Sequence, residues 1–329
     1  MSTADADAPP TTPPTEPPNV VEVTDVWRSF GDVVALQDLN LRVPKGRITV
    51  LLGPNGAGKT TAIRMITGAL EVDRGTVSTF GLDPRRDGRE IRRRCGVVSA
   101  KPALYDRLSG HDNLDYAARL YGLGRDAHDR ILDAATRFGI QDSLDQQVGG
   151  YSTGMKTRLA LARSILHEPD LLLFDEPTSG LDPESSAAVL ELIRKMTSEG
   201  RTVVMCTHLL VEAEGLADSV VMLEYGTDLL AGPPDQLTRD LWPGHLVRID
   251  AEQRQALDEL EGRDGVLSFR RNGHVELELD DLRHVPDIIA DLTGAGVRLT
   301  RVEPHVPSLE DLYFEVRRRR RAEGIETPL

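Results

Sequence analysis

The residues with the clearest chemical pattern form the stretch GPNGAGKTT, residues 53–61. An apolar run, residues 48–52, precedes it and a helical pattern, residues 62–66, follows it, so the predicted order is strand, glycine-rich loop, helix. Loop glycines let successive backbone N–H groups surround an anion, and the helix N-terminus adds partial positive charge. In such a phosphate-binding loop (Walker A), Lys59 reaches the β- and γ-phosphates and the Thr60 hydroxyl binds Mg²⁺. The predicted nucleotide-binding residues are Gly53, Pro54, Asn55, Gly56, Ala57, Gly58, Lys59, Thr60 and Thr61.

A second pattern combines an apolar strand with two acids. Residues 171–174 are Leu-Leu-Leu-Phe and lead directly into Asp175 and Glu176. Downstream of a phosphate-binding loop, this order is typical of a Walker B strand. We therefore expect Asp175 to hold Mg²⁺ through water and Glu176 to orient or deprotonate an attacking water.

A histidine ends another predicted strand. His208 follows the apolar run of residues 202–206. Ligands of open α/β sheets bind at the carboxyl ends of parallel strands, so we predict that His208 hydrogen-bonds a γ-phosphate. The predicted catalytic residues are Glu176, His208 and Lys59.

Two weaker patterns predict further nucleotide contacts, one with an anionic group and one with the base. Ser152 and Gly154 precede a predicted helix over residues 156–167, and such a helix start is an anion-binding end. Phe30 stands beside Gly31 ahead of the phosphate-binding loop and is predicted to stack on a nucleobase; ordinary core packing is the alternative.

The elements that must position these residues divide the chain. Residues 1–19 are rich in Pro, Thr and acids and are predicted to be a disordered tail, because they bury too little apolar surface to fold. Residues 20–235 alternate buried strands with helices, and within them residues 106–150 have helical spacing, which predicts a helical insertion. The segment of residues 85–94 contains six arginines, typical of a solvated helix face.

Beyond residues 232–234 (Gly-Pro-Pro), a smaller α+β domain is expected. Residues 240–316 have the order β-α-β-β-α-β of a ferredoxin-like module, with a helix expected over residues 251–261 and a final helix at residues 308–316. Five consecutive arginines open the predicted basic tail, residues 317–329. Either this tail is solvated or it contacts anionic lipid head groups.

Composition excludes several classes of function. The net charge of −14 argues against general affinity for nucleic acid, which needs a broad basic surface. The sequence has no apolar run long enough to span a membrane and no apolar leader, so neither a transmembrane segment nor a secretory signal is expected. Two cysteines give neither a disulfide framework nor a CxxC metal site.

Taken together, the motifs of residues 20–235 resemble the ATP-binding subunit of an ABC transporter in order and spacing. Residues 307–313 (Pro-Ser-Leu-Glu-Asp-Leu-Tyr) are similar to the C-terminal extension of the exporter-type branch, which pairs with a separate permease. The resemblance implies a P-loop NTPase ABC cassette with a mixed sheet core and a helical subdomain at residues 106–150. ATP and Mg²⁺ are the implied ligands.

The resemblance also implies an assembly and a location. Two cassettes pack head to tail, as a homodimer, so that Ser152 and Gly154 face the γ-phosphate bound to the partner's Lys59. Closure on ATP moves an integral membrane permease, and hydrolysis assisted by Glu176 resets it. The implied location is the cytoplasm, peripheral on the inner face of the cell membrane.

Two departures from the family pattern bear on activity. The signature reads Tyr-Ser-Thr-Gly-Met at residues 151–155 instead of Leu-Ser-Gly-Gly-Gln, and Ala100 stands where a glutamine normally touches Mg²⁺ and water. On the resemblance as a whole, the main hypothesis is an ATPase that powers export. The alternatives are a soluble non-transport ABC ATPase acting on ribosomes or DNA, and a hydrolysis-poor regulatory cassette because of Ala100.

Overall fold

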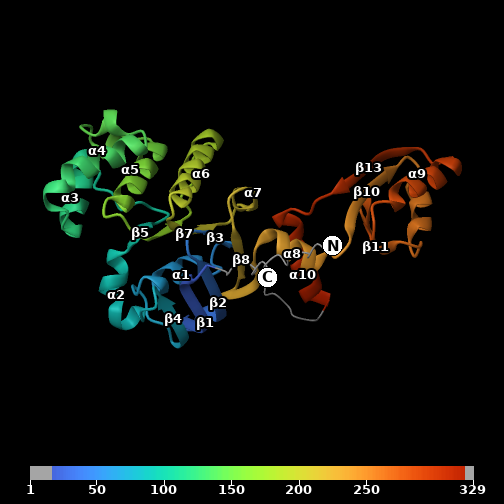
Figure 1. The fold of residues 1–329 in the computed structure, drawn as a ribbon, viewed down its shortest axis with the longest axis horizontal. Helices are drawn as coiled ribbons and strands as arrows, with labels where there is room; N and C mark the ends of the chain where they lie inside the picture. Colours follow the sequence, from blue (N-terminus) through green and yellow to red (C-terminus); the bar gives the residue numbers. More distant parts are fainter. Residues whose placement is uncertain (1–16, 323–329) are drawn as a thin grey trace, which may run out of the picture.

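A six-stranded sheet forms the centre of the computed structural model, which describes residues 17–322 (Figure 1). Its strand order is β5-β6-β7-β3-β8-β9, and all neighbours are parallel except β8 and β9. The strands are β3 (Ile48–Leu52), β5 (Cys95–Val98), β6 (Leu171–Asp175), β7 (Thr202–Thr207), β8 (Ser219–Glu224) and β9 (Thr227–Gly232). Strands β3, β6 and β7 are buried along their whole length, as expected where helices cover both faces of a parallel sheet.

The order β6-β7-β3 determines where chemistry can take place. These strands are adjacent and parallel, so their carboxyl ends meet at one edge. Gly53 follows β3, Glu176 follows β6 and His208 follows β7. Three segments far apart in the sequence therefore converge at this edge.

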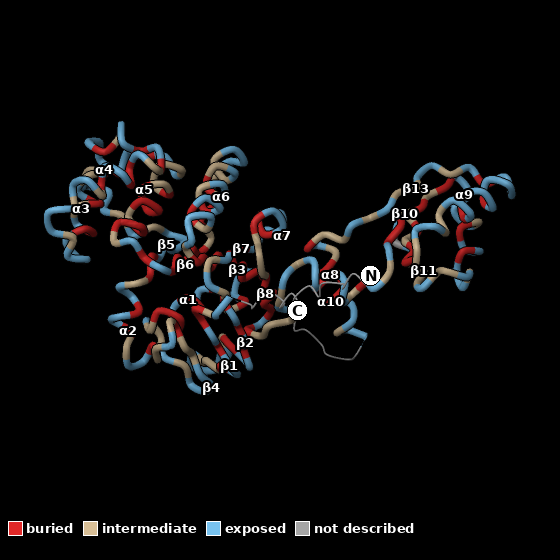
Figure 2. Tube along the Cα trace, in the orientation of Figure 1, coloured by how far each residue is buried: buried red, intermediate tan, exposed pale blue. Residues whose placement is uncertain are grey.

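A second, antiparallel sheet covers the N-terminal side of the cassette. Its order is β2-β1-β4, from β1 (Asn19–Phe30), β2 (Val33–Pro44) and β4 (Arg74–Thr79). Alternate residues of β1 and β2 are buried and form a core with α1 (Lys59–Ile66) and one face of the central sheet. Figure 2 shows this buried layer between the two sheets.

Helices form a separate lobe beside the sheet edge. It consists of α3 (Gly110–Tyr121), α4 (Ala127–Arg137) and α5 (Thr153–Ile165), which pack on one another. A reciprocal cap between Ser109 and Asp112 starts α3, and the Ser152 hydroxyl caps α5. The lobe thus extends past the expected residues 106–150, because α5 supplies one of its packed faces. The other cassette helices are α2 (Pro84–Arg93), α6 (Pro183–Ser198), α7 (Leu210–Glu214) and α8 (Pro234–Leu241).

The C-terminal strands form an antiparallel sheet with its own core. The order β11-β12-β10-β13 is that of a ferredoxin-like module, built from β10 (His245–Ala251), β11 (Val266–Asn272), β12 (His274–Leu279), β13 (Leu299–His305) and helix α9 (His284–Gly294). The α-helix expected over residues 251–261 is wrong in type: Arg254–Leu260 is a 3₁₀ helix. Its buried residues Leu257 and Leu260 are three apart, which matches three residues per turn.

The last helix, α10 (Leu309–Ala322), corrects two expected boundaries. It continues through the arginine run, so residues 317–322 are helix and not tail; residues 323–329 lie outside the described part. Leu309 and Leu312 are buried in the core of the cassette and not in the core of the module, so α10 packs with the cassette. The physical reason for both corrections is that α10 has apolar and ionic partners on α7, α8 and β8.

A buried glutamate pairs with two members of the arginine run. Glu315 is 4% exposed and pairs with Arg270, Arg318 and Arg319 at 2.9, 2.8 and 2.7 Å. Burial acts to raise the pKa of Glu315, but hydrogen bonds from Arg318 and Arg319 and the charge of Arg270 outweigh it and lower the pKa to about 2. Arg317 pairs instead with Glu224 at 3.1 Å. Within residues 17–322, no helix is long and apolar enough to cross a membrane.

We predict that Glu315→Gln lowers the thermal midpoint at pH 7. A carboxyl pKa that is depressed in the folded state stabilises that state above the unfolded pKa, here by on the order of 3 kcal/mol at most. The difference between wild type and variant should be constant from pH 7 to 5 and shrink as pH falls from 4.5 toward 2. Thermal unfolding at pH 7, 5 and 3.5 measures it. Glu310→Gln, an exposed position on the same helix, is the matched control; an equal, pH-independent loss in both variants contradicts the ionic account.

Candidate functional site

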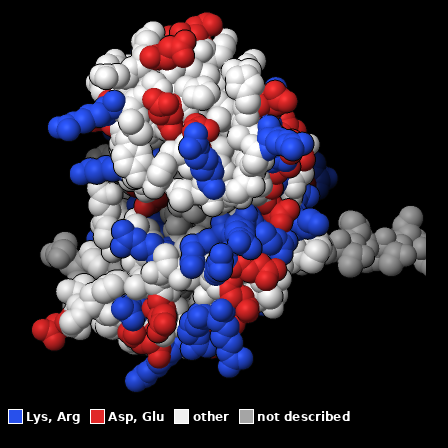
Figure 3. Space-filling model, turned by 90° about the vertical axis from the view of Figure 1, so that its left-hand side faces the viewer, with Lys and Arg blue, Asp and Glu red and all other residues white. Residues whose placement is uncertain are grey.

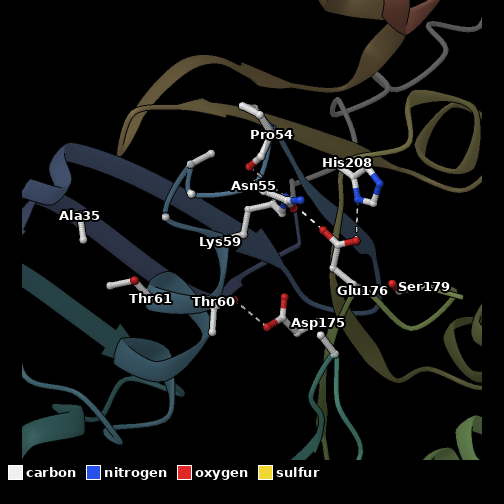
Figure 4. A pocket seen from close by; sticks show the side chains of 14 residues that line it. Ala35, Pro54, Asn55, Lys59, Thr60, Thr61, Asp175, Glu176, Ser179 and His208 are labelled. Atoms are coloured by element: carbon white, nitrogen blue, oxygen red, sulfur yellow. Dashed lines mark hydrogen bonds and ion pairs between the residues drawn. The ribbon is translucent and has the colours of Figure 1, made fainter. Parts of the chain in front are cut away.

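A cavity of about 350 Å³ opens at the edge where β3, β6 and β7 end (Figure 4). Most of the residues singled out from the sequence as chemical groups line it. The lining residues are Ala35, Pro54, Asn55, Gly56, Ala57, Gly58, Lys59, Thr60, Thr61, Ala100, Asp175, Glu176, Ser179 and His208. Its size is in the ordinary range of small-molecule sites.

The loop between β3 and α1 requires glycine at particular positions. Gly56 and Gly58 have φ of 84° and 102°, which side chains with a Cβ rarely adopt. A Cβ on Gly58 would lie 2.7 Å from both the Ala35 carbonyl oxygen and a Leu36 methyl. A Cβ on Gly53 would lie 2.2 Å from the Leu223 carbonyl oxygen. The loop is thus pressed against its neighbours, and its backbone lines the cavity at the start of α1.

Lys59 is held in place by hydrogen bonds within its own loop. Its side chain is only 6% exposed, and Nζ donates to the carbonyl oxygens of Gly53 and Pro54 at 2.5 and 3.2 Å. Nζ also lies 3.2 Å from Glu176 Oε1. A buried ammonium with a fixed direction is suited to an anionic ligand in the cavity.

Thr60 and Asp175 form a pair of oxygen donors. The Thr60 hydroxyl donates to Asp175 Oδ2 at 2.7 Å, from the first turn of α1 to the end of β6 (Figure 4). Hydroxyl and carboxylate oxygens are hard ligands, and Mg²⁺ usually takes only one or two protein groups beside phosphates and waters. The donor set therefore fits Mg²⁺. Residues 17–322 contain no cluster of three or more His, Cys, Asp or Glu that would hold a metal by itself.

Glu176 lies between the Lys59 ammonium and the His208 ring and contacts both. Its Oε2 accepts from His208 Nδ1 at 2.6 Å, while Oε1 faces Lys59 (Figure 4). The backbone of Glu176 is left-handed, with φ of 54°, although its N–H still donates to the Cys206 carbonyl at 3.0 Å. Such a conformation costs about 1–3 kcal/mol and persists only where the surroundings hold it. Here it turns the carboxylate into the cavity directly after the buried strand.

Four predicted site residues lie outside the cavity lining. Gly53 lies behind it, bonded through its N–H to the Thr207 carbonyl at 3.3 Å. Phe30 is 45% exposed at the end of β1, and the central guanidinium carbon of Arg28 lies 4.8 Å from the centre of its ring. Ser152 and Gly154 start α5, and Gly154 lies near Ser185 and Leu181 of the segment after β6.

The structure adds residues that the sequence did not single out for this site. Ala35 and Ser179 line the cavity. Gly226, in the turn between β8 and β9, donates to the Ala57 carbonyl at 3.1 Å and accepts from the Gln37 N–H at 2.8 Å. Gly226 thereby joins the phosphate-binding loop to β2. The sequence shows only a glycine between two predicted strands, which is too common to identify it; its φ of 81° is seen in the structure alone.

Comparisons with known proteins agree with this geometry. A family model described as "ABC transporter" matches residues 36–179, and one described as "ATP-binding protein DrrA1-3-like, C-terminal domain" matches residues 232–316. The ABC transporter ATP-binding protein NatA of Bacillus subtilis is 40% identical over 224 residues, 66% of this chain and 91% of that protein. The daunorubicin resistance ATP-binding protein DrrA2 of Streptomyces coeruleorubidus is 33% identical over 300 residues, 88% and 92% of the two chains. A solved "ATP binding subunit of ABC transporter" is similar at a TM-score of 0.62 and 32% identity, covering 67% of this chain and 92% of that one.

We predict that Gly58→Ala weakens nucleotide binding tenfold or more. The added methyl meets the β2 backbone and requires a strained φ, so the loop must move. Titration with a fluorescent ATP analogue measures the effect. Gly56→Ala is the matched control, since it has the same φ problem but no atom within 4 Å of the added Cβ, and it should lose less. Equal losses in the two variants would show that the contact with Ala35 has no role.

Proposed function

The chain is an ATP-binding subunit of the ABC transporter family, and from that membership we propose that it hydrolyses MgATP between two cassettes and powers an exporter-type permease. The observation that carries the proposal is the convergence of Lys59, Asp175, Glu176 and His208 in one cavity. Lys59 starts α1 after β3, Asp175 and Glu176 lie at the end of β6, and His208 follows β7. Each of the four has a defined partner.

The proposed reaction is in-line attack of water on the γ-phosphorus. Glu176 orients the water and accepts its proton as the new P–O bond forms and the bond to the β–γ bridging oxygen breaks. Lys59 neutralises charge on the phosphate oxygens, and the Nδ1–H of His208 donates to the Glu176 carboxylate and orients it. In the proposed ATP-bound state, this N–H is released from Glu176 and donates to the γ-phosphate. Mg²⁺ held by Thr60 and Asp175 would neutralise charge on the β- and γ-phosphates. The loop amides of residues 56–61 cradle the phosphates.

The second half of the site is proposed to come from a second copy. Ser152 and Gly154 are at the N-terminus of α5, away from the cavity of their own chain, and Ser152 and Thr153 are exposed. A helix start of this kind binds anions. In a head-to-tail homodimer it would face the γ-phosphate held by the partner's Lys59. Phe30, exposed at the end of β1, is the proposed platform for the adenine.

The permease is proposed to dock beside the loop that follows β5. Leu104 is partly buried there, and Tyr105 and Leu108 are 50% and 38% exposed, so the loop presents neighbouring apolar side chains to a partner. Two sets of relatives are named for daunorubicin resistance and for Nod factor export, which supports the outward direction. The proposed location is the cytoplasmic face of the cell membrane, with residues 20–235 as the cassette and residues 240–308 as an accessory module.

We predict that Glu176→Gln reduces MgATP turnover at least a hundredfold and leaves ATP-bound dimers. The amide keeps the shape and the contact to His208 but does not accept the proton of the attacking water. Phosphate release and size-exclusion chromatography with ATP measure the two effects. Glu191→Gln, an exposed glutamate of α6, is the matched control and should behave as wild type. Turnover that survives Glu176→Gln would remove Glu176 from its role as base.

We predict that Ala100→Gln raises turnover or leaves it unchanged. Ala100 lines the cavity but has no polar atom for Mg²⁺ or water, whereas a glutamine oxygen would. Steady-state phosphate release measures the rate, with Ala290→Gln on the exposed face of α9 as the matched control. A large fall for Ala100→Gln alone would mean that the cavity works in a different geometry at this position.

A further inference from the structure

Helix α2 has a buried face of three residues and an outer face made only of charged ones. Pro84, Gly88 and Ile91 are buried, at the spacing of one helix face. The exposed residues are Arg85, Arg86, Arg89, Glu90, Arg92 and Arg93. At 100° per residue, Arg86, Arg89 and Arg93 point most directly away from the buried face. We call these three residues the basic stripe.

The flanking arginines of α2 are already used inside the molecule. Arg85 pairs with Asp83 at 3.4 Å. Arg92 donates to the carbonyl oxygens of Thr67 and Gly68 at 3.1 and 3.2 Å. The Arg92 contacts fix the last turn of α2 against the end of α1, and the Arg85 pair stays within the start of α2.

The basic stripe has no such partner. Within residues 17–322, neither Arg86, Arg89 nor Arg93 forms an ion pair or a side-chain hydrogen bond. The arginine run of α10 differs, because Glu315 and Glu224 pair with its first three members. The stripe is therefore a concentrated positive charge on a chain whose net charge is −14.

The position of the stripe links it to the proposed permease side. Helix α2 packs on β4 and on the edge strand β5, and the loop with Tyr105 and Leu108 follows that same edge strand. Figure 1 shows α2 and the helical lobe at the same end of the molecule. Figure 3 looks onto that end and shows Lys and Arg gathered in a band across it, below the lobe.

We propose that the basic stripe of Arg86, Arg89 and Arg93 binds the anionic phospholipid head groups of the membrane beside the permease. The proposal rests on the proposed function, which determines the side of the molecule that faces the membrane. Guanidinium groups bind phosphate by paired hydrogen bonds, and clustered basic residues on a helix are attracted to anionic leaflets. The rest of the acidic surface is repelled by the same leaflet, so the attraction orients the cassette.

A lipid surface suits this face better than a protein does. Protein interfaces need apolar or aromatic anchors at their core and have few charges there. The outer face of α2 offers no apolar side chain. A layer of mobile phosphates needs only accessible positive charge.

The test is sedimentation of the purified full-length chain with vesicles of phosphatidylcholine, with and without phosphatidylglycerol. We expect binding only to the anionic vesicles, weakening as salt is raised. The triple variant Arg86→Gln/Arg89→Gln/Arg93→Gln should bind them at least tenfold more weakly, since each basic residue contributes about fivefold. Glutamine has a helix propensity near that of arginine, so α2 should be retained.

A matched triple variant removes the same charge elsewhere. Arg42, Arg125 and Arg239 are exposed and have no ion pair within residues 17–322, and their glutamine variants should bind as wild type. Binding that is absent in wild type, or equally weakened in both triple variants, overturns the proposal. So does a stripe variant that binds vesicles normally but loses its permease, which would indicate a protein partner. ATP hydrolysis without vesicles, assayed separately, tests the proposed function and the folding of both variants.

Discussion

The parallel pairing of β6, β7 and β3 is the constraint on which the site depends. Backbone hydrogen bonds in this order place the ends of three buried strands at one edge. The Glu176 N–H bonds to the Cys206 carbonyl and the Gly53 N–H to the Thr207 carbonyl, so the ladder continues into the functional segments themselves. The relative positions of Gly53, Asp175, Glu176 and His208 therefore follow from strand register.

Close backbone packing around the phosphate-binding loop is the second requirement. Gly226 forms backbone hydrogen bonds with Ala57 and with Gln37 of β2. The carbonyl oxygen of Ala35, also in β2, lies so close to Gly58 that no Cβ fits there. Through these contacts the antiparallel sheet, the loop and the turn after β8 form one unit. Because Glu224 in that turn region pairs with Arg317, helix α10 is connected to the same unit.

Charge is distributed in two different ways on this acidic chain. Along α10, Arg317 pairs with Glu224 of β8 and Glu315 pairs with Arg270 of β11, and these ion pairs attach the helix. Along α2, the outermost arginines have no partner within residues 17–322. Both segments are similar in sequence, since each concentrates arginine within one helix. Only the neighbours that the fold supplies distinguish an internal ionic contact from a surface available to a ligand.

Local order and composition determined much about this protein by themselves. A strand, a glycine-rich loop and Lys-Thr at a helix start predict phosphate binding because backbone geometry requires those residue types in that order. The two acids at the end of β6 predict a metal and water site because such a site needs carboxylates. The order of the C-terminal strands also predicted the ferredoxin-like module. Tertiary structure alone decided the rest: that α10 packs on the cassette, that residues 254–260 form a 3₁₀ helix, that Ala35, Ser179 and Gly226 surround the loop, and which arginines are neutralised. These depend on contacts between residues far apart in the chain, and no local pattern encodes the partner.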